Sequence, residues 1–108
     1  MTERIVRTTA TADDDIRTIH AWWTENRTAA PKLFLTELAH AVSFIGSSPF
    51  VSKRYRAPGV PTLRRYLLRT TRYHVYYIAS EQDVVILTVW GAVKGTTPNF
   101  KQIVASIG

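Results

Sequence analysis

The stretch TLRRYLLRTTRYHVYYIAS, residues 62–80, decides the fold of this chain. It divides into two runs of strand length, 62–70 and 72–80, in which aliphatic residues and tyrosines predominate. The break between them is short and polar, which favours two antiparallel neighbours joined by a tight turn. A third run, DVVILTVWG at 83–91, follows after another short break. Apolar residues occur at both odd and even positions of this run, as expected of a strand that is central or covered on both faces. The sequence therefore predicts three consecutive antiparallel strands.

The first two of these strands carry four cations. Arg64, Arg65, Arg69 and Arg72 lie within residues 62–80, and no carboxylate accompanies them. Because side chains alternate between the two faces of a strand, Arg65 and Arg69 share one face while Arg64 shares the other with apolar residues. Isolated burial of a cation is costly, so Arg64 is either part of a buried structural ion pair or a functional residue in a groove. Both alternatives stay open at this stage.

Upstream of the three strands, two helices are predicted. RIVRTT at 4–9 is typical of a short first strand, and a helix follows with Thr11 as its N-cap. Asp13, Asp14 and Asp15 fall in its first turn, where the helix dipole favours anions, and capping explains them better than catalysis. A second helix begins near Pro31 and is expected to stop at Gly46, with apolar residues at helical spacing between. The short gap between the helices favours an antiparallel hairpin.

The tryptophans and the C-terminal tail add two local predictions. Trp23 shares the apolar face of the first helix with Ile16 and Ile19, so it is expected in the core, whereas Trp22 diverges from it by roughly 100°. After a break at 95–98, apolar residues at helical spacing predict a short C-terminal helix. The whole chain, 1–108, is predicted to be one α+β domain of order β-α-α-β-β-β. Its sheet would have four antiparallel strands with the helical hairpin on one face.

The distribution of charge points to a polyanionic partner. The net charge is +6, and residues 51–108 hold nine Lys and Arg against two Asp and Glu. The proline-rich loop at 48–61 supplies part of this charge, and tyrosines lie among the cations, where they can stack bases or pack an amphipathic helix. The predicted basic surface comprises Lys53, Arg54, Arg56, Arg65, Arg69, Arg72 and Lys94.

Several classes of function lose support. Cysteine is absent, and the three histidines are scattered without a ligand-rich pattern, so we expect no metal, no cofactor and only structural or solvated histidines. No nucleophile elbow, phosphate-binding glycine loop or dinucleotide fingerprint occurs. The longest apolar run, 84–93, is too short to cross a bilayer, and the N-terminus carries no apolar signal, so we expect a cytoplasmic protein without membrane contact.

The ordered set of motifs resembles the RelE/ParE superfamily of bacterial toxins, and is closer to the ParE (plasmid stabilisation) branch. The residues that carry the resemblance are the Ala-x-x-Asp start of the first helix (Ala12 to Asp15), Arg64, the tyrosine pair 76–77, and the hydrophobic last strand with its end at 90–94. This resemblance implies a toxin of a type II toxin–antitoxin system. It implies a cognate antitoxin whose extended or helical segment covers the basic sheet face, with operator DNA bound only through that antitoxin.

The resemblance leaves two targets open. RelE-like members cleave mRNA on the ribosome without metal, and the catalytic candidates here are Arg64, Arg65 and Lys94. However, Phe100 stands where a tyrosine would assist proton transfer, and arginine stays protonated, so a general base is missing. ParE-like members inhibit DNA gyrase without being enzymes, and this reading is favoured. The ribosome-dependent endoribonuclease and an inactive antitoxin-binding or co-repressor module are the alternatives. The residues expected to bind a partner or nucleic acid are the seven of the basic surface with Arg64, Tyr77 and Trp90.

Overall fold

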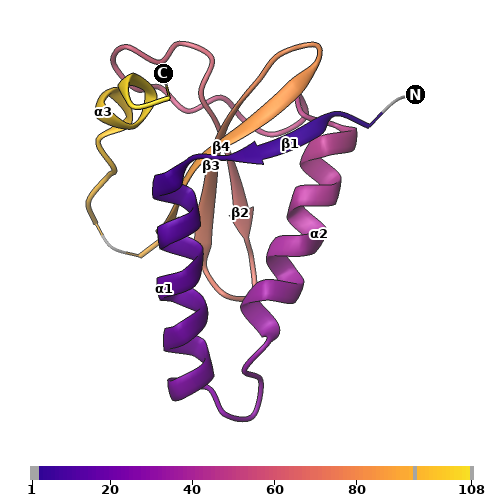
Figure 1. Ribbon diagram of the computed structural model, residues 1–108, viewed down its shortest axis with the longest axis vertical. Helices are drawn as coiled ribbons and strands as arrows, with labels where there is room; N and C mark the ends of the chain where they lie inside the picture. The colour runs from indigo at the N-terminus through magenta and orange to yellow at the C-terminus, as the bar shows by residue number, and fades with distance from the viewer. Residues whose placement is uncertain (1–2, 94, 108) are drawn as a thin grey trace.

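The computed structural model describes residues 3–93 and 95–107, which form one mixed sheet with three helices. The elements in chain order are β1 (Ile5–Thr8), α1 (Ala10–Asn26), α2 (Leu33–Ser47), β2 (Arg64–Leu68), β3 (Tyr73–Ala79), β4 (Asp83–Gly91) and α3 (Phe100–Ala105). The order of strands in the sheet is β1-β4-β3-β2, so β1 and β2 are the two edges. The long helices α1 and α2 form an antiparallel hairpin (Figure 1). The predicted α+β order, the hairpin and the C-terminal helix are confirmed.

The sheet is antiparallel only in part. β2, β3 and β4 pair antiparallel, as the short breaks between them predicted. β1 instead joins β4 in parallel, with Ile5 opposite Asp83 and Thr8 opposite Ile86. The helical hairpin returns the chain to the side on which β1 begins (Figure 1), so β2 and β1 run in the same direction. Since β2 and β4 are also parallel to each other, β1 lies parallel to β4 rather than antiparallel.

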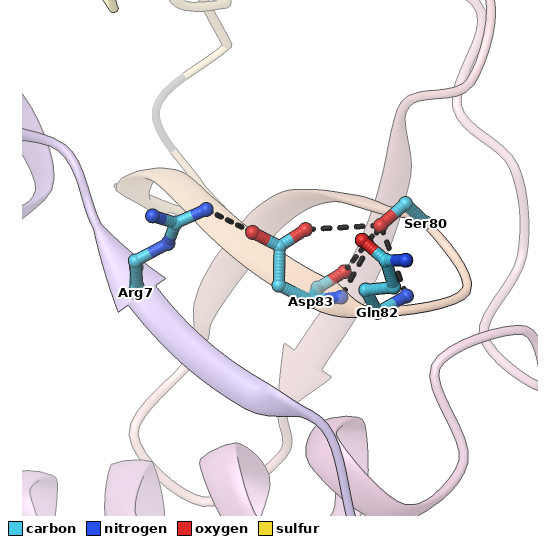
Figure 2. Close-up of polar contacts among 4 residues, drawn as sticks. All are labelled: Arg7, Ser80, Gln82 and Asp83. Atoms are coloured by element: carbon cyan, nitrogen blue, oxygen red, sulfur yellow. Dashed lines mark hydrogen bonds and ion pairs between the residues drawn. The ribbon is translucent and has the colours of Figure 1, made fainter.

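Polar contacts at one corner of the sheet fix the register of β1. Figure 2 shows Arg7 of β1 reaching across to the carboxylate of Asp83 at the start of β4. On the other side of that carboxylate, Ser80 Oγ donates to Asp83 Oδ1 at 2.9 Å within the β3–β4 turn. These hydrogen bonds, from Ser80 and then from Arg7, lower the pKa of Asp83. A second arginine, Arg4, donates through Nε to the Ser80 carbonyl at 2.9 Å.

The start of α1 is tied directly to β4. Thr9, and not Thr11 as predicted, is the N-cap: its Oγ accepts from the Ala12 N–H at 3.0 Å. The same hydroxyl donates to the Leu87 carbonyl at 2.7 Å. A threonine that lies at the end of β1 in an extended conformation can make both bonds, whereas Thr11 already lies inside the helix.

Gly46 does not end the second helix. α2 continues to Ser47, and Gly46 is a buried helical residue. A Cβ at this position would lie 3.2 Å from the side chain of Val6, and the Gly46 carbonyl accepts from the Arg4 N–H at 3.0 Å. The glycine is therefore needed for the close approach of α2 to β1 and not for a helix stop.

The larger core lies between the helical hairpin and the sheet. Trp23 is buried there, as predicted, and its Nε1–H donates to the Tyr73 hydroxyl at 3.1 Å. Phe34 packs edge-on against the same tyrosine, with 5.2 Å between ring centroids. Trp22 is 43% exposed and contacts the edge of Trp23. The core residues of this side are Ala12, Trp23, Phe34, Leu38, Ala41, Ile45, Leu68, Val75, Tyr77, Val84, Ile86 and Val89.

A second, smaller core covers part of the opposite face of the sheet, where the sequence predicted only a basic surface. The loop between α2 and β2 contributes Val60 and Leu63, and α3 contributes Phe100 and Ile103. They pack on Tyr76 and Leu87 of the sheet, and the Phe100 ring lies 4.7 Å from that of Tyr76. The part of this face next to the β2 edge is left open. Within the described residues, no helix is long and apolar enough to span a membrane.

Candidate functional site

The open part of the second face forms a groove of about 540 Å³ along the edge of β2. We call it the β2 groove. Its lining comes from α2, the loop that precedes β2, and strands β2 and β3: Phe44, Val51, Ser52, Lys53, Arg65, Tyr66, Leu67, Arg69 and His74. Three of these side chains are cations, and no carboxylate occurs among the described residues that line the groove. The groove is therefore suited to an anion that also offers apolar surface.

Among the described residues, the backbone of the β2 edge is paired only at its beginning. The loop pairs with it as a short antiparallel bridge between Arg54 and Arg64. In this bridge the Tyr55 N–H donates to the Leu63 carbonyl at 2.9 Å, and the Arg65 N–H donates to the Lys53 carbonyl at 3.1 Å. The loop then leaves the edge. Since alternate residues of a strand direct their backbone groups to the same side, the N–H and C=O of Leu67 also point away from β3, into the β2 groove.

Arg64 turns its guanidinium away from the β2 groove and toward the loop. Its Nη1 donates to the Ser52 carbonyl at 2.6 Å and to the Phe50 carbonyl at 3.1 Å. The cation also lies over the Phe50 ring, 5.4 Å from its centroid. Neither of the alternatives left open by the sequence describes this arrangement, because the partners are backbone carbonyls and not a carboxylate or a groove ligand. Arg64 thus acts as a positioning residue for the loop.

Tyr77 holds the same loop from the neighbouring strand β3. Its buried hydroxyl donates to the Pro49 carbonyl at 2.8 Å. Burial raises the pKa of Tyr77, so the phenol stays neutral and keeps its donor. Together with Arg64, which is directly opposite in the register, it fixes residues 49–52 at one end of the β2 groove. Two of the residues predicted to bind a partner therefore shape the site without lining it.

Arg65 and His74 lie on the open face. The guanidinium of Arg65 is 4.6 Å from the centroid of the Tyr55 ring. His74 lies beside Tyr76, with 5.8 Å between ring centroids. Burial, and then the charges of Arg65 and Arg72, lower the pKa of His74 below its usual 6.5, so its imidazole is neutral at neutral pH. From the sequence alone, His74 is expected to be structural or solvated. Its place opposite Leu67 follows from the strand register once β2 and β3 are paired.

A comparison with solved structures gives the fold a context. The chain matches one chain of a structure described as "Chromosomal ParDE TA system from P. aeruginosa" with a TM-score of 0.65. The match covers 82% of this chain and 96% of that one, at 13% sequence identity. The fold is the ParE/RelE fold. At this identity the likeness establishes the fold alone. No protein-family model matches the sequence, and a search of curated proteins found no match either.

On this ParE/RelE fold, the remaining predicted site residues do not form one patch. Arg54 and Arg56 lie in the loop beside a separate hollow that reaches Val60 and Pro61. Trp90 is at the end of β4, and its Nε1–H donates to the Thr96 carbonyl at 3.0 Å. Lys94 lies outside the described residues. Of the predicted residues, the β2 groove brings together Lys53, Arg65 and Arg69.

The turn between β2 and β3 is held by a carboxylate from α2. Glu37 accepts from the Thr70 N–H at 2.8 Å, and from the N–H and hydroxyl of Thr71 at 2.9 and 2.6 Å. Burial alone would raise the pKa of Glu37, but these hydrogen bonds outweigh it and lower the pKa. Arg72 completes the turn with φ at 68°, a left-handed conformation that is unusual for an arginine. The turn presents Arg69 and Arg72 to solvent.

The aspartates at the start of α1 have structural roles. Asp13 accepts from the Thr8 hydroxyl, and Asp14 pairs with Arg17 on the same helix. Asp15 accepts from the Thr88 hydroxyl and, at 3.1 Å, from the Val89 N–H, so it caps the part of β4 that extends beyond its pairing with β1. Within residues 3–93 and 95–107, no group of three histidines or carboxylates is arranged to hold a metal ion.

Proposed function

We propose that this chain is the toxin of a type II toxin–antitoxin system, that a cognate antitoxin neutralises it in the cytoplasm, and that it inhibits DNA gyrase. The observation that carries the proposal is the match to a chain of a structure described as a ParDE toxin–antitoxin system, over 82% of this chain and 96% of that one. The sequence motifs that resemble the superfamily, from Ala12 to the end of the last strand, support it independently.

Two features favour gyrase inhibition over mRNA cleavage. Phe100 is 5% exposed and packs against Tyr76 in the smaller core, away from the β2 groove, and it has no hydroxyl for proton transfer. Arg64, one of the catalytic candidates, donates to loop carbonyls and is not directed at a substrate site. A toxin that acts by binding gyrase needs neither group as a catalyst.

The test is a supercoiling assay with purified gyrase. We expect the chain to inhibit supercoiling of relaxed plasmid in a dose-dependent manner and to induce the SOS response when it is expressed without antitoxin. Relaxation by topoisomerase I in the same preparation should be unaffected. Normal supercoiling at saturating protein would eliminate the gyrase target. Expression that leaves growth unaffected would instead support the inactive, antitoxin-binding module.

A ribosome-dependent endoribonuclease is a second candidate, and His74 is the observation that favours it. A neutral imidazole beside Arg65 supplies the base that arginine cannot provide. His74 would take the proton of a ribose 2′-hydroxyl, and the 2′-oxygen would attack phosphorus. The 5′-oxygen would leave with a proton from water, and a 2′,3′-cyclic phosphate would remain. This mechanism predicts cuts in translated mRNA that disappear in His74→Ala and persist in His40→Ala, a change at an exposed position on α2. Cuts that persist in both variants would exclude His74 as the base.

A further inference from the structure

A second hollow, of about 330 Å³, lies between α1, the start of β3 and the end of β4. We call it the α1–β4 pocket. Its lining includes two carboxylates, Asp14 and Asp15, and the aromatic residues Trp22, Tyr73 and Trp90. Among the described residues, no lysine, arginine or histidine lines this pocket, and no lining residue is shared with the β2 groove. Hollows of this volume are typical of small-molecule sites, and this lining suits a cation with an apolar body.

One oxygen of Asp15 remains available for a ligand. Its Oδ2 accepts from the Thr88 hydroxyl and from the Val89 N–H, so the carboxylate is held against β4. No group in the described part of the chain donates to Oδ1. Asp14, by contrast, has a side chain that is 71% exposed and that already pairs with Arg17. Asp15 is therefore the carboxylate that can accept a charge-assisted hydrogen bond inside the pocket.

The opposite end of the pocket is apolar. Trp22 lies two helical turns after Asp15 on α1, about 10 Å along the helix axis, and Ile19 lines the pocket between them. Arg27 places its guanidinium 5.0 Å from the centroid of the Trp22 ring, but Arg27 itself does not line the pocket. This positive charge disfavours a second cation nearby, so the Trp22 end suits an uncharged aliphatic chain.

We infer that the α1–β4 pocket binds a free linear organic cation, with one ammonium or guanidinium head at Asp15 and an aliphatic chain that runs past Ile19 to Trp22. The head needs N–H groups, because Oδ1 of Asp15 can only accept hydrogen bonds. The methylene stem of an arginine is shorter than the span from Asp15 to Trp22, so an arginine of another polypeptide would bring its backbone into the pocket. A free molecule is therefore favoured. The inference does not depend on the proposed function, since neither gyrase nor an antitoxin takes part in it.

The probe for this site is hexylguanidinium, compared with two ligands of the same chain length. Hexylurea has a planar head without the charge, and hexyltrimethylammonium has the charge without N–H donors. For a ligand of this size we expect a Kd of about 1 mM for hexylguanidinium, and about tenfold weaker binding of the other two. NMR locates the site. The indole N–H of Trp22 and the methyl groups of Ile19 should shift, and NOEs should connect these methyl groups to the hexyl chain.

A substitution at Asp15 tests the contact with the head. Asp15→Asn keeps an oxygen for the Thr88 hydroxyl and the Val89 N–H but replaces Oδ1 with an amide NH2 group, so affinity for hexylguanidinium should fall about tenfold. Asp13→Asn makes the same change of charge nearby on α1. Asp13 accepts from the Thr8 hydroxyl and does not line the pocket, so this control should leave the affinity unchanged.

The length of the ligand tests the apolar end of the pocket. Each buried methylene should strengthen binding about fourfold, so affinity should rise steadily from propylguanidinium to hexylguanidinium. Trp22→Ala should remove the gain from the outermost methylenes, because the ring that they contact is absent. Trp22→Phe keeps an aromatic ring at this position and should retain most of the gain.

Several results would overturn the inference. One is the absence of any shift at about 20 mM hexylguanidinium, where a site with the expected Kd would be almost full. Others are equal binding of hexylurea or hexyltrimethylammonium, and unchanged affinity in Asp15→Asn. Tighter binding of acetyl-Gly-Arg-Gly-amide than of hexylguanidinium would assign the pocket to an arginine of a partner protein instead of a free molecule. Circular dichroism checks that Asp15→Asn is folded. If it is not, the comparison of the three ligands on the unaltered chain decides the question.

Discussion

The two faces of this sheet are built from the same four strands and carry opposite kinds of surface. The face under α1 and α2 is closed by two long helices, and its core residues are apolar throughout. The other face is covered by a loop and a six-residue helix, and the part left open carries Lys53, Arg65 and Arg69. Arg64 and Arg65 are neighbours on one strand, yet Arg64 binds the loop that covers the sheet and Arg65 lines the open groove. The role of each arginine therefore depends on the face of β2 from which its side chain projects, and on what packs against that face.

Truncation of one phenylalanine on each face should give the largest contrast. Phe34→Ala removes a fully buried ring from the helix-covered core and should lower the free energy of unfolding by about 3–5 kcal/mol. Phe100→Ala should cost about 2 kcal/mol, because the short helix α3 can relax into the space that the ring leaves. Urea unfolding at neutral pH measures both values. Equal losses would mean that the two faces form one cooperative core.

Arg64 and Arg69 project from opposite faces of the same strand segment and offer the next contrast. Arg64→Ala removes two charge-assisted hydrogen bonds to Phe50 and Ser52 and should cost about 2 kcal/mol. Arg69→Ala, at an exposed position in the β2 groove, should change stability by no more than about 0.5 kcal/mol. Limited proteolysis should cut residues 49–53 faster in the first variant only. If the two variants unfold at the same urea concentration, Arg64 does not hold the loop.

Glu37 connects the helix-covered face to the open face, because this residue of α2 accepts hydrogen bonds from the turn between β2 and β3. The pH dependence of stability tests this connection. The pKa of Glu37 is lower in the folded protein than the ordinary 4.5, so its contribution is complete above that pH and is lost as the pH falls through the folded value. At pH 7, Glu37→Gln should therefore cost about 1–2 kcal/mol. The difference from the unaltered chain should shrink steadily below about pH 4.5.

Glu25→Gln, at an exposed position on α1, serves as the control. Its unfolding curve should follow that of the unaltered chain at every pH. A cost of Glu37→Gln that is the same at pH 3 and pH 7 would show that the charge of Glu37 does not stabilise the turn.

Local periodicity was enough to predict the helical hairpin, the antiparallel strands β2, β3 and β4, and α3, because those elements are encoded in the spacing of apolar residues a few positions apart. Three features could not be predicted. They are the parallel pairing of β1 with β4, the burial of the loop residues Val60 and Leu63 against the sheet, and the backbone carbonyls that bind Arg64. Each of these features depends on the position of a segment whose sequence has no regular spacing of apolar residues. Strand alternation did separate Arg64 from Arg65 and Arg69, and the latter two are the ones that line the β2 groove.

The smallest expected effect is a gain in stability at the turn between β2 and β3. Arg72 has a left-handed backbone conformation that costs a residue with a Cβ energy and costs glycine little. Arg72→Gly should therefore raise the free energy of unfolding by about 0.5 kcal/mol, since the release of strain exceeds the added entropy of the unfolded chain. The same change also removes one of the two charges that lower the pKa of His74, which should rise toward 6.5 in an NMR titration. If Arg72→Gly is destabilising, the arginine side chain makes a stabilising contribution at the turn. If Arg72→Gly is stabilising, the arginine at this position lowers the stability of the fold. Such a cost is expected where a cation binds a partner and does not stabilise the fold.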